Sequence, residues 1–179
     1  MVTGPGAGQP VVQRLGAALR REREAYDPGG DRPIGGYVAV MATYVGGISA
    51  LTAVVRRSGR PLPAPGPWDV LLTAGAVHRL SRVLAKDPVT SPFRLPFTRF
   101  RGQAGPAELD EDVRGSGVRR TVGELVTCPF CVGLWVATAV TGAQVFAPRA
   151  TRLACSGLTA LTVADFLHFA RAGLHEHVD

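Results

Sequence analysis

The sequence predicts an all-α fold, a multi-pass membrane helix bundle of about four transmembrane helices with a cytoplasmic loop. Three observations support this prediction. The charged fraction of 19% lies below the roughly 25% that is usual in soluble domains. The apolar residues fall into long blocks, and two of those blocks contain no charged residue. The chain has 179 residues and no evident internal repeat, so we expect one domain.

The first block gives the strongest evidence for a span. Residues 34–55 run for 22 positions without a charge. This length is enough to cross a hydrocarbon layer of about 30 Å at about 1.5 Å per residue. A signal peptide is the competing interpretation, but its apolar core would be shorter, and Arg56 and Arg57 follow the segment like a stop-transfer flank. Residues 131–147 form a second uncharged run of 17 positions, at the lower limit for a span.

Two further apolar segments carry charges. Residues 68–84 and 153–174 would suit a buried helix of a soluble protein as well as a span. The uncharged runs already indicate a bilayer, so we predict four spans within a membrane domain over residues 34–174. The spans cover residues 34–55, 68–84, 131–147 and 153–174.

The distribution of basic residues predicts the orientation. Fifteen of the 20 basic residues lie before residue 34, between Arg79 and Arg120, or at Arg171, and the other five lie on the opposite side of the predicted spans. Loops rich in Lys and Arg stay in the cytoplasm. We therefore expect an inner-membrane protein whose central loop and two tails, residues 1–33 and 175–179, are cytoplasmic.

The segments outside the spans differ in composition. Residues 11–23 place apolar side chains on one helical face among arginines, which predicts an amphipathic helix on anionic lipid, with an ordinary solvated helix as the alternative. Residues 87–101 interleave Pro, Phe and Arg, which indicates an extended segment at the headgroup level and, more weakly, a segment that stacks on single-stranded nucleic acid. Residues 102–117 are Gly-rich and acidic with little apolar content, so we expect a flexible insert.

Small residues and buried charges predict how the helices associate. Ala42, Gly46 and Ala50 form a stripe along which helix backbones can approach each other. A charge at the centre of a span costs roughly 2.5 to 3.5 kcal/mol on insertion scales and needs a partner or a nearby headgroup.

Asp165 lies at nearly the same depth as Arg79, and Arg82 lies one turn nearer the cytoplasm. We predict an ion pair between Asp165 and Arg79 or Arg82. In the alternative, both arginines reach the inner headgroups and Asp165 caps a local group.

Cys128 and Cys131 form a Cys-Pro-Phe-Cys pair at the cytoplasmic start of the third span. A helix N-terminus stabilises a thiolate, so the pair is a candidate redox site, although no βαβ pattern surrounds it. A closed zinc site needs four ligands, and the candidates for the other two are His78 and His168, with His175 and His177 in the tail, although their spacing does not demand a site. Packing or capping, redox chemistry and metal binding all stay open, and zinc is the cofactor that these residues suggest.

Two sequence blocks resemble a known family. "HRLSRVLAKDPVTSPFRLPF" (78–97) followed by "GELVTCPFCVGLWVA" (123–137) is similar to an uncharacterised bacterial membrane family, domain of unknown function 1360, which includes a sporulation-associated protein of bacilli. The resemblance covers about residues 35–172 and implies that the inner face is the functional surface. The matching positions are Arg79, Arg82, Asp87, Arg94, Gly123, Glu124, Cys128, Pro129, Cys131 and Trp135.

These patterns predict an integral membrane protein of unassigned molecular function. The sequence contains no phosphate-binding glycine loop, His-Glu-x-x-His motif or Ser-His-Asp order, which favours a non-enzymatic component of envelope or developmental, sporulation-type, assembly. We expect it to act through a cytoplasmic-face cluster that includes Asp87, Arg94 and Glu124. The alternative is a thiol-redox or metal-binding membrane protein. The expected partners are anionic lipid headgroups and a protein or a second copy of the chain, and the pattern disfavours nucleic acid.

Overall fold

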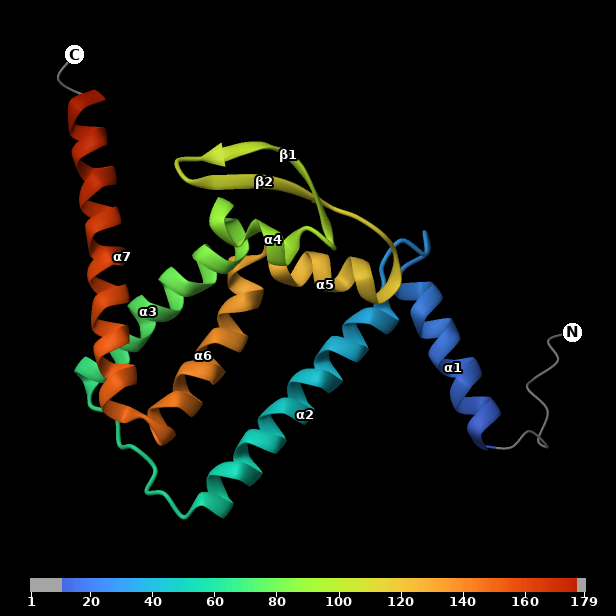
Figure 1. Ribbon diagram of the computed structural model, residues 1–179. Helices are drawn as coiled ribbons and strands as arrows, with labels where there is room; N and C mark the ends of the chain where they lie inside the picture. The colour runs from blue at the N-terminus through green and yellow to red at the C-terminus, as the bar shows by residue number, and fades with distance from the viewer. Residues whose placement is uncertain (1–10, 177–179) are drawn as a thin grey trace, which may run out of the picture.

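The computed structural model describes residues 11–176, so residues 1–10 and 177–179, the ends of the two predicted tails, lie outside it. Figure 1 shows long helices that stand side by side and carry a small hairpin at one end. The elements in chain order are α1 (Val11–Tyr26), α2 (Ile34–Ser58), α3 (Pro67–Lys86), the 3-10 helix η1 (Pro88–Thr90), α4 (Ser91–Arg94), β1 (Thr98–Gly105), β2 (Glu108–Val113), α5 (Gly117–Thr127), α6 (Pro129–Phe146) and α7 (Pro148–Glu176).

The long helices α2, α3, α6 and α7 alternate in direction. α2 and α6 run away from the hairpin, and α3 and α7 return toward it (Figure 1). The start of α2 and the last turns of α7 therefore lie at the hairpin end of the bundle. α3 packs against both α6 and α7, whereas α2 makes most of its contacts with α5.

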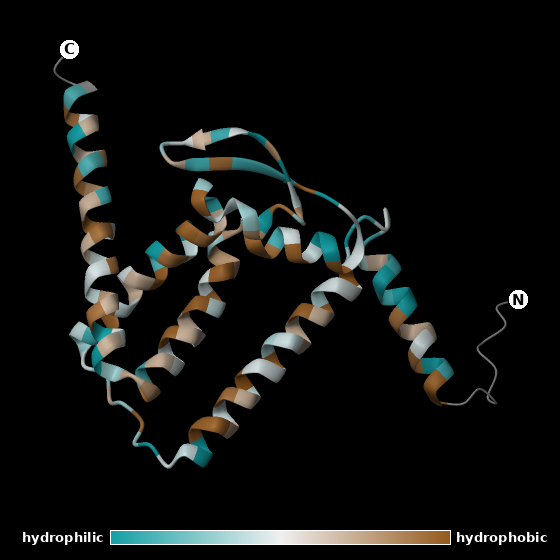
Figure 2. Ribbon diagram, viewed as in Figure 1, coloured by the Kyte–Doolittle hydropathy of each residue, from teal (hydrophilic) through white to brown (hydrophobic). Residues whose placement is uncertain are grey.

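Three of these helices, α2, α6 and α7, are long and apolar enough to cross a membrane by length and composition. Large apolar side chains on their outer surface are exposed, for example Met41 at 60% and Leu161 at 50%. Figure 2 shows that α6 and most of α2 are lined by apolar and neutral residues, whereas α7 carries hydrophilic residues toward both of its ends. α3, the second predicted span, falls outside this group because it carries Asp69, Arg79, Arg82 and Lys86.

The ends of the helices follow from local sequence. α2 ends at Ser58 and is capped by Gly59, whose left-handed φ of 62° is readily adopted by a residue without a Cβ. α3 begins with Pro67 in its first turn, and the carboxylate of Asp69 accepts a hydrogen bond from the Gly66 N–H at 3.1 Å. These caps hold the loop at the end of the bundle opposite to the hairpin.

The fold is not all-α, and residues 102–117 are not a flexible insert. β1 and β2 pair antiparallel from Thr98 opposite Val113 to Gly105 opposite Glu108, with two register irregularities. These strands form although the stretch has little apolar content. The hairpin instead pairs a basic strand with an acidic one, so that Arg99 lies opposite Asp112.

The predicted small-residue stripe on α2 does not form a helix contact, since Gly46 has no neighbouring atom within 4 Å of the position that a Cβ would take. Close approach occurs elsewhere. A Cβ on Gly75 of α3 would lie 2.5 Å from the hydroxyl oxygen of Thr159 on α7. That hydroxyl donates to the carbonyl of Leu72 at 2.7 Å, so a hydrogen bond joins α3 and α7 at this close approach.

Candidate functional site

Asp87, Arg94, Glu124 and the cysteine pair lie at the hairpin end of the bundle. Here α4, α5 and the β1–β2 hairpin form a layer that we call the cap (Figure 1). α5 contacts α2, α3 and α6, while β2 contacts both α3 and α5. The cap therefore joins the ends of several long helices.

Arg94 is the centre of the cap. Its side chain is 1% exposed, and its Nε donates to Oε2 of Glu111 on β2 at 2.5 Å. Its two terminal nitrogens donate to the Leu84 carbonyl at 2.8 Å, the Thr90 hydroxyl at 2.7 Å and the Asp87 carbonyl at 3.0 Å. A buried charge is costly unless it is paired and hydrogen-bonded, and Arg94 meets both conditions. It thereby connects the hairpin to the end of α3.

Glu111 is the member of this network that sequence reasoning missed. Its side chain is 7% exposed, and its Oε1 lies 2.9 Å from the Thr98 hydroxyl, which is also 3.0 Å from the Arg94 carbonyl. Glu111 belongs to a run of acidic residues that resembles a solvated loop. The useful signal was the neighbouring basic segment, because two oppositely charged segments around a Gly-Pro turn can pair as strands.

The charges of α3 have separate partners. Arg79 contacts Asp165 of α7, which is one of the two pairs that the sequence suggested. Arg82 instead forms a salt bridge with Glu108 at the start of β2. Asp87 follows the last residue of α3, and its carboxylate accepts a hydrogen bond from the Val89 N–H at 2.8 Å. Arg82 thus provides a second attachment of the hairpin to the bundle.

Glu124 lies in a different network from Asp87 and Arg94. One of its carboxylate oxygens accepts a hydrogen bond from the Tyr37 hydroxyl of α2 at 2.7 Å. The other accepts one from Nε of Arg120 at 3.1 Å. The expected cluster of Asp87, Arg94 and Glu124 is therefore divided between the hairpin attachment and the α2–α5 contact.

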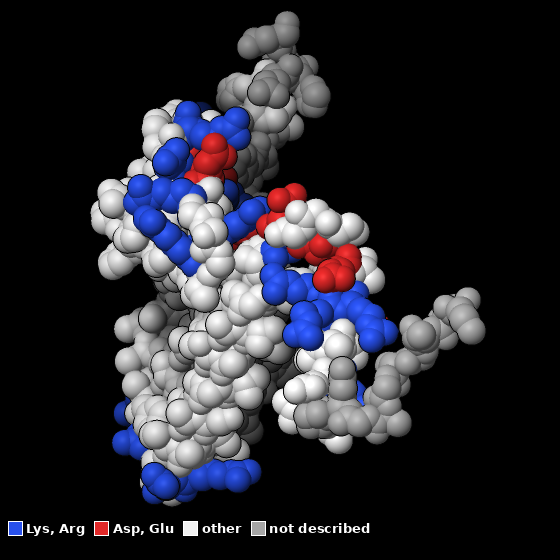
Figure 3. All heavy atoms as spheres, turned by 90° about the vertical axis from the view of Figure 1, so that its right-hand side faces the viewer, with Lys and Arg blue, Asp and Glu red and all other residues white. Residues whose placement is uncertain are grey.

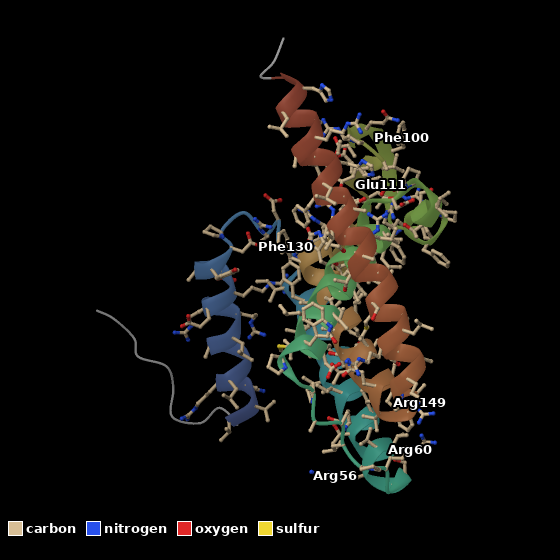
Figure 4. All side chains as sticks on the ribbon, turned by 90° about the vertical axis from the view of Figure 1, so that its left-hand side faces the viewer. Arg56, Arg60, Phe100, Glu111, Phe130 and Arg149 are labelled. Carbon is tan, nitrogen blue, oxygen red and sulfur yellow. The ribbon has the colours of Figure 1, made fainter. Side chains whose placement is uncertain are left out.

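The cysteine pair begins α6. The Cys128 thiol caps the helix and accepts a hydrogen bond from the Cys131 N–H at 3.4 Å, while Phe130 between them is 93% exposed (Figure 4). Burial raises the pKa of the Cys128 thiol. Hydrogen bonds from Cys131 and from the Phe130 backbone, together with the positive charge of Lys86, outweigh burial, so that the pKa lies below its usual value. This environment favours the thiolate.

The structure does not assemble the suggested zinc ligands. Among residues 11–176, no three side chains of His, Cys, Asp or Glu converge as a metal site. The ring of His78 stacks on Phe166, with ring centroids 6.1 Å apart and planes at 23°. His78 and His168 therefore do not complete a four-ligand site with Cys128 and Cys131.

Charged side chains gather at the two ends of the bundle. On the face in Figure 3, a band without charge separates basic residues at the far end from a mixture of basic and acidic residues around the cap. The acidic residues near the cap include Glu108, Glu111 and Glu124, each of which pairs with an arginine. An uncharged band between two charged ends matches a bilayer between two aqueous phases.

Comparisons with known proteins identify one family. The sequence model of one family, described as "Protein of unknown function (DUF1360)", matches residues 71–171. Sporulation protein YjcA of Bacillus subtilis (strain 168) is 32% identical over 100 residues, which cover 51% of this chain and 85% of that protein. No solved structure matches the chain. The family match begins within α3, so it contains the cap and the cysteine pair but not α2. The resemblance expected from the sequence began earlier, near residue 35.

Proposed function

The chain belongs to the DUF1360 family of proteins of unknown function, and from this premise we propose a role for it as a non-enzymatic membrane protein. In this proposal α2, α3, α6 and α7 cross the inner membrane, and the cap is a cytoplasmic platform on which a protein partner docks. The similarity to a sporulation protein supports a place in envelope or developmental assembly.

The directions of the helices support four crossings. α2 and α6 run in the same direction (Figure 1). If both of these apolar helices cross the membrane, the chain must cross back between them, and α3 is the long helix that lies between them in the sequence. Three of the charges of α3 have partners, and the fourth, Lys86, is the last residue of the helix, so these charges are compatible with this role. Arg152 binds Asp69 at 3.1 Å at one end, and Asp165 and Glu108 pair with Arg79 and Arg82 toward the other.

The observation that carries the proposal is the buried bond between Arg94 and Glu111. A buried ion pair in itself stabilises a fold little. The four hydrogen bonds that Arg94 donates to α3, the segment that follows it and β2 suggest instead that the pair fixes the position of the hairpin. The fixed cap exposes aromatic side chains, with Phe93 at 76% and Phe100 at 66%. Exposed aromatic residues on a rigid support are typical of docking surfaces.

The excess of basic residues on the cap side supports a cytoplasmic orientation. A single-cysteine variant that keeps Cys131 tests it with a membrane-impermeant maleimide. We expect labelling only after the cells are permeabilised. Arg57→Cys in a cysteine-free background, at the opposite end, should be labelled in intact cells. The reverse pattern would overturn the orientation.

Docking is tested by photo-crosslinking in cells. A crosslinking amino acid at Phe100 should join one discrete protein, and the same group at Leu62, which is 73% exposed at the opposite end, should not. Glu111→Gln, which releases the hairpin, should reduce the crosslink. Crosslinks from both positions in equal yield, or to lipid alone, would contradict a platform.

A thiol-redox function is the second candidate, favoured by the lowered pKa of Cys128 and the nearby Cys131. It predicts that the pair changes between a dithiol and a disulfide in cells, detected by a shift in mass after alkylation. A metal-binding version predicts one equivalent of zinc in the purified protein. Thiols that stay reduced and free of metal would leave the platform as the better account.

A further inference from the structure

We propose that the groove between α2 and α6 holds an acyl chain of an anionic phospholipid, with the lipid phosphate beside Arg56 and Arg60. The lipid belongs to the leaflet at the end of the bundle opposite to the cap. This inference rests on the membrane-spanning part of the proposed function and assigns a ligand to a surface outside the cap.

The groove is apolar and open along its side. It has a volume of about 490 Å³, and Ile48, Leu51 and Val55 of α2 face Ala137 and Val145 of α6 across it. A hydrogen bond of 2.9 Å between the hydroxyls of Tyr44 and Thr138 joins the two helices on the cap side of this opening. The groove is therefore closed toward the cap and continues toward the far end.

The length of the groove matches one leaflet. From Ile48 to Arg56 the rise along α2 is about 12 Å at about 1.5 Å per residue. The rise from Ala137 to Val145 along α6 is about the same. Half of a hydrocarbon layer of about 30 Å is about 15 Å. Ile48 itself lies about 21 Å along α2 from Ile34, so the groove occupies the far half of the bilayer.

The far end of the groove is positively charged. Arg56 lines it, and Arg60 donates from Nη1 to the Phe146 carbonyl at 2.8 Å while lying over the Phe146 ring (Figure 4). Basic side chains gather at this end, blue at the bottom of Figure 3. By their places at the end of α2, just after it and in the first turns of α7, the arginines of this end are Arg56, Arg57, Arg60, Arg149 and Arg152.

Acidic residues do not balance this charge. Residues 34–86 and 125–164 contain one acidic residue, Asp69, which already pairs with Arg152. Within the described part of the chain, Arg56 and Arg60 form no salt bridge. Arginines at headgroup depth are stabilised by anions, and their guanidinium geometry suits phosphate.

The same charges decide between a lipid and a second copy of the chain. A copy docked in the groove with the same orientation would bring five further arginines to this end, and like charges repel. A phospholipid supplies both an apolar chain for the groove and a negative group for its mouth. Charge complementarity therefore favours an anionic phospholipid.

The test uses the full-length protein, purified in detergent and titrated with phosphatidylglycerol or phosphatidylcholine, with bound lipid counted by native mass spectrometry. We expect one phosphatidylglycerol to be retained in preference to phosphatidylcholine. Arg56→Gln should weaken its binding about fivefold, the effect of one basic residue near a lipid surface, and the matched Arg57→Gln, outside the groove, by less than about twofold. Val55→Phe should fill the groove and abolish retention, whereas Val54→Phe, on a side chain that is 54% exposed, should not.

Three results would overturn the assignment: equal effects of Arg56→Gln and Arg57→Gln, no preference between the two lipids, or a dimer without bound lipid. Arg56 is on the surface, so its variant decides the question even if Val55→Phe fails to fold. Washing membranes at alkaline pH tests the membrane proposal separately. A chain released by the wash would refute the spanning model, and a retained chain without lipid preference would refute the groove alone.

Discussion

Removing the charge of Glu111 should release the hairpin from the bundle. Glu111→Gln keeps the size of the side chain but leaves the Arg94 guanidinium buried without a counter-charge, since Arg94 is 1% exposed and Glu111 is 7% exposed. The adjacent residue provides a matched control. Asp112 pairs with Arg101 at 3.2 Å, but the two side chains are 59% and 62% exposed. Asp112→Asn therefore makes the same chemical change in a solvated pair.

The two substitutions should differ widely in energy. Breaking a buried pair costs about 3 to 5 kcal/mol, whereas exposed pairs contribute about 0.2 to 1 kcal/mol. Arg94 keeps its hydrogen bonds to the Thr90 hydroxyl and to two carbonyls, so we expect the lower end, about 3 kcal/mol. Since about 1.4 kcal/mol is a factor of ten, the amides of β1 and β2 should exchange roughly 100 times faster in Glu111→Gln and less than about five times faster in Asp112→Asn.

Hydrogen exchange followed by mass spectrometry of peptides covering residues 98–113, in detergent or nanodiscs, measures this difference. The peptides from α6 serve as an internal reference and should exchange at unchanged rates. If the two variants accelerate exchange equally, or if Glu111→Gln changes it less than about threefold, Arg94 and Glu111 do not hold the hairpin in place.

Three further predictions follow from contacts within the bundle. Gly75→Ala should lower the midpoint of thermal unfolding by the equivalent of about 1 to 3 kcal/mol, because its Cβ would overlap α7, whereas Gly46→Ala, with open space, should not lower it. Asp165→Asn and Arg79→Gln should be non-additive by about 1 kcal/mol in unfolding free energy, and Asp165→Asn with Arg82→Gln should be additive, because Arg82 pairs elsewhere. The rate of Cys128 alkylation, measured on its peptide, should reach half of its maximum at a lower pH than that of a free cysteine, because the thiolate is favoured. For the same reason the Cys128 thiolate should stabilise the fold at a pH above its pKa, and this stabilisation should be lost as the pH falls through that pKa.

The long apolar helices could be predicted because they depend on composition along a single segment. An uncharged run such as residues 34–55 favours an apolar helix whatever its neighbours in the fold, and α2 begins at Ile34, where that run begins. The contact between Arg79 and Asp165 could also be anticipated, since helical rise alone places the two side chains at a similar depth. The hairpin could not be anticipated in this way, because Glu111 is stabilised by Arg94, 17 positions away, and not by its neighbours in sequence.

What the sequence determined by itself was the character of single segments: long uncharged runs, a strong excess of arginine between them, and a cysteine pair at the start of a helix. What only the tertiary structure decided was which charges meet. It paired Arg82 with Glu108 instead of Asp165, and it buried Arg94 with Glu111. It placed Glu124 in a third contact, with Tyr37 of α2. The physical reason is range: hydrophobic burial in lipid depends on each segment alone, whereas an ion pair forms only between groups that folding brings within a few ångströms.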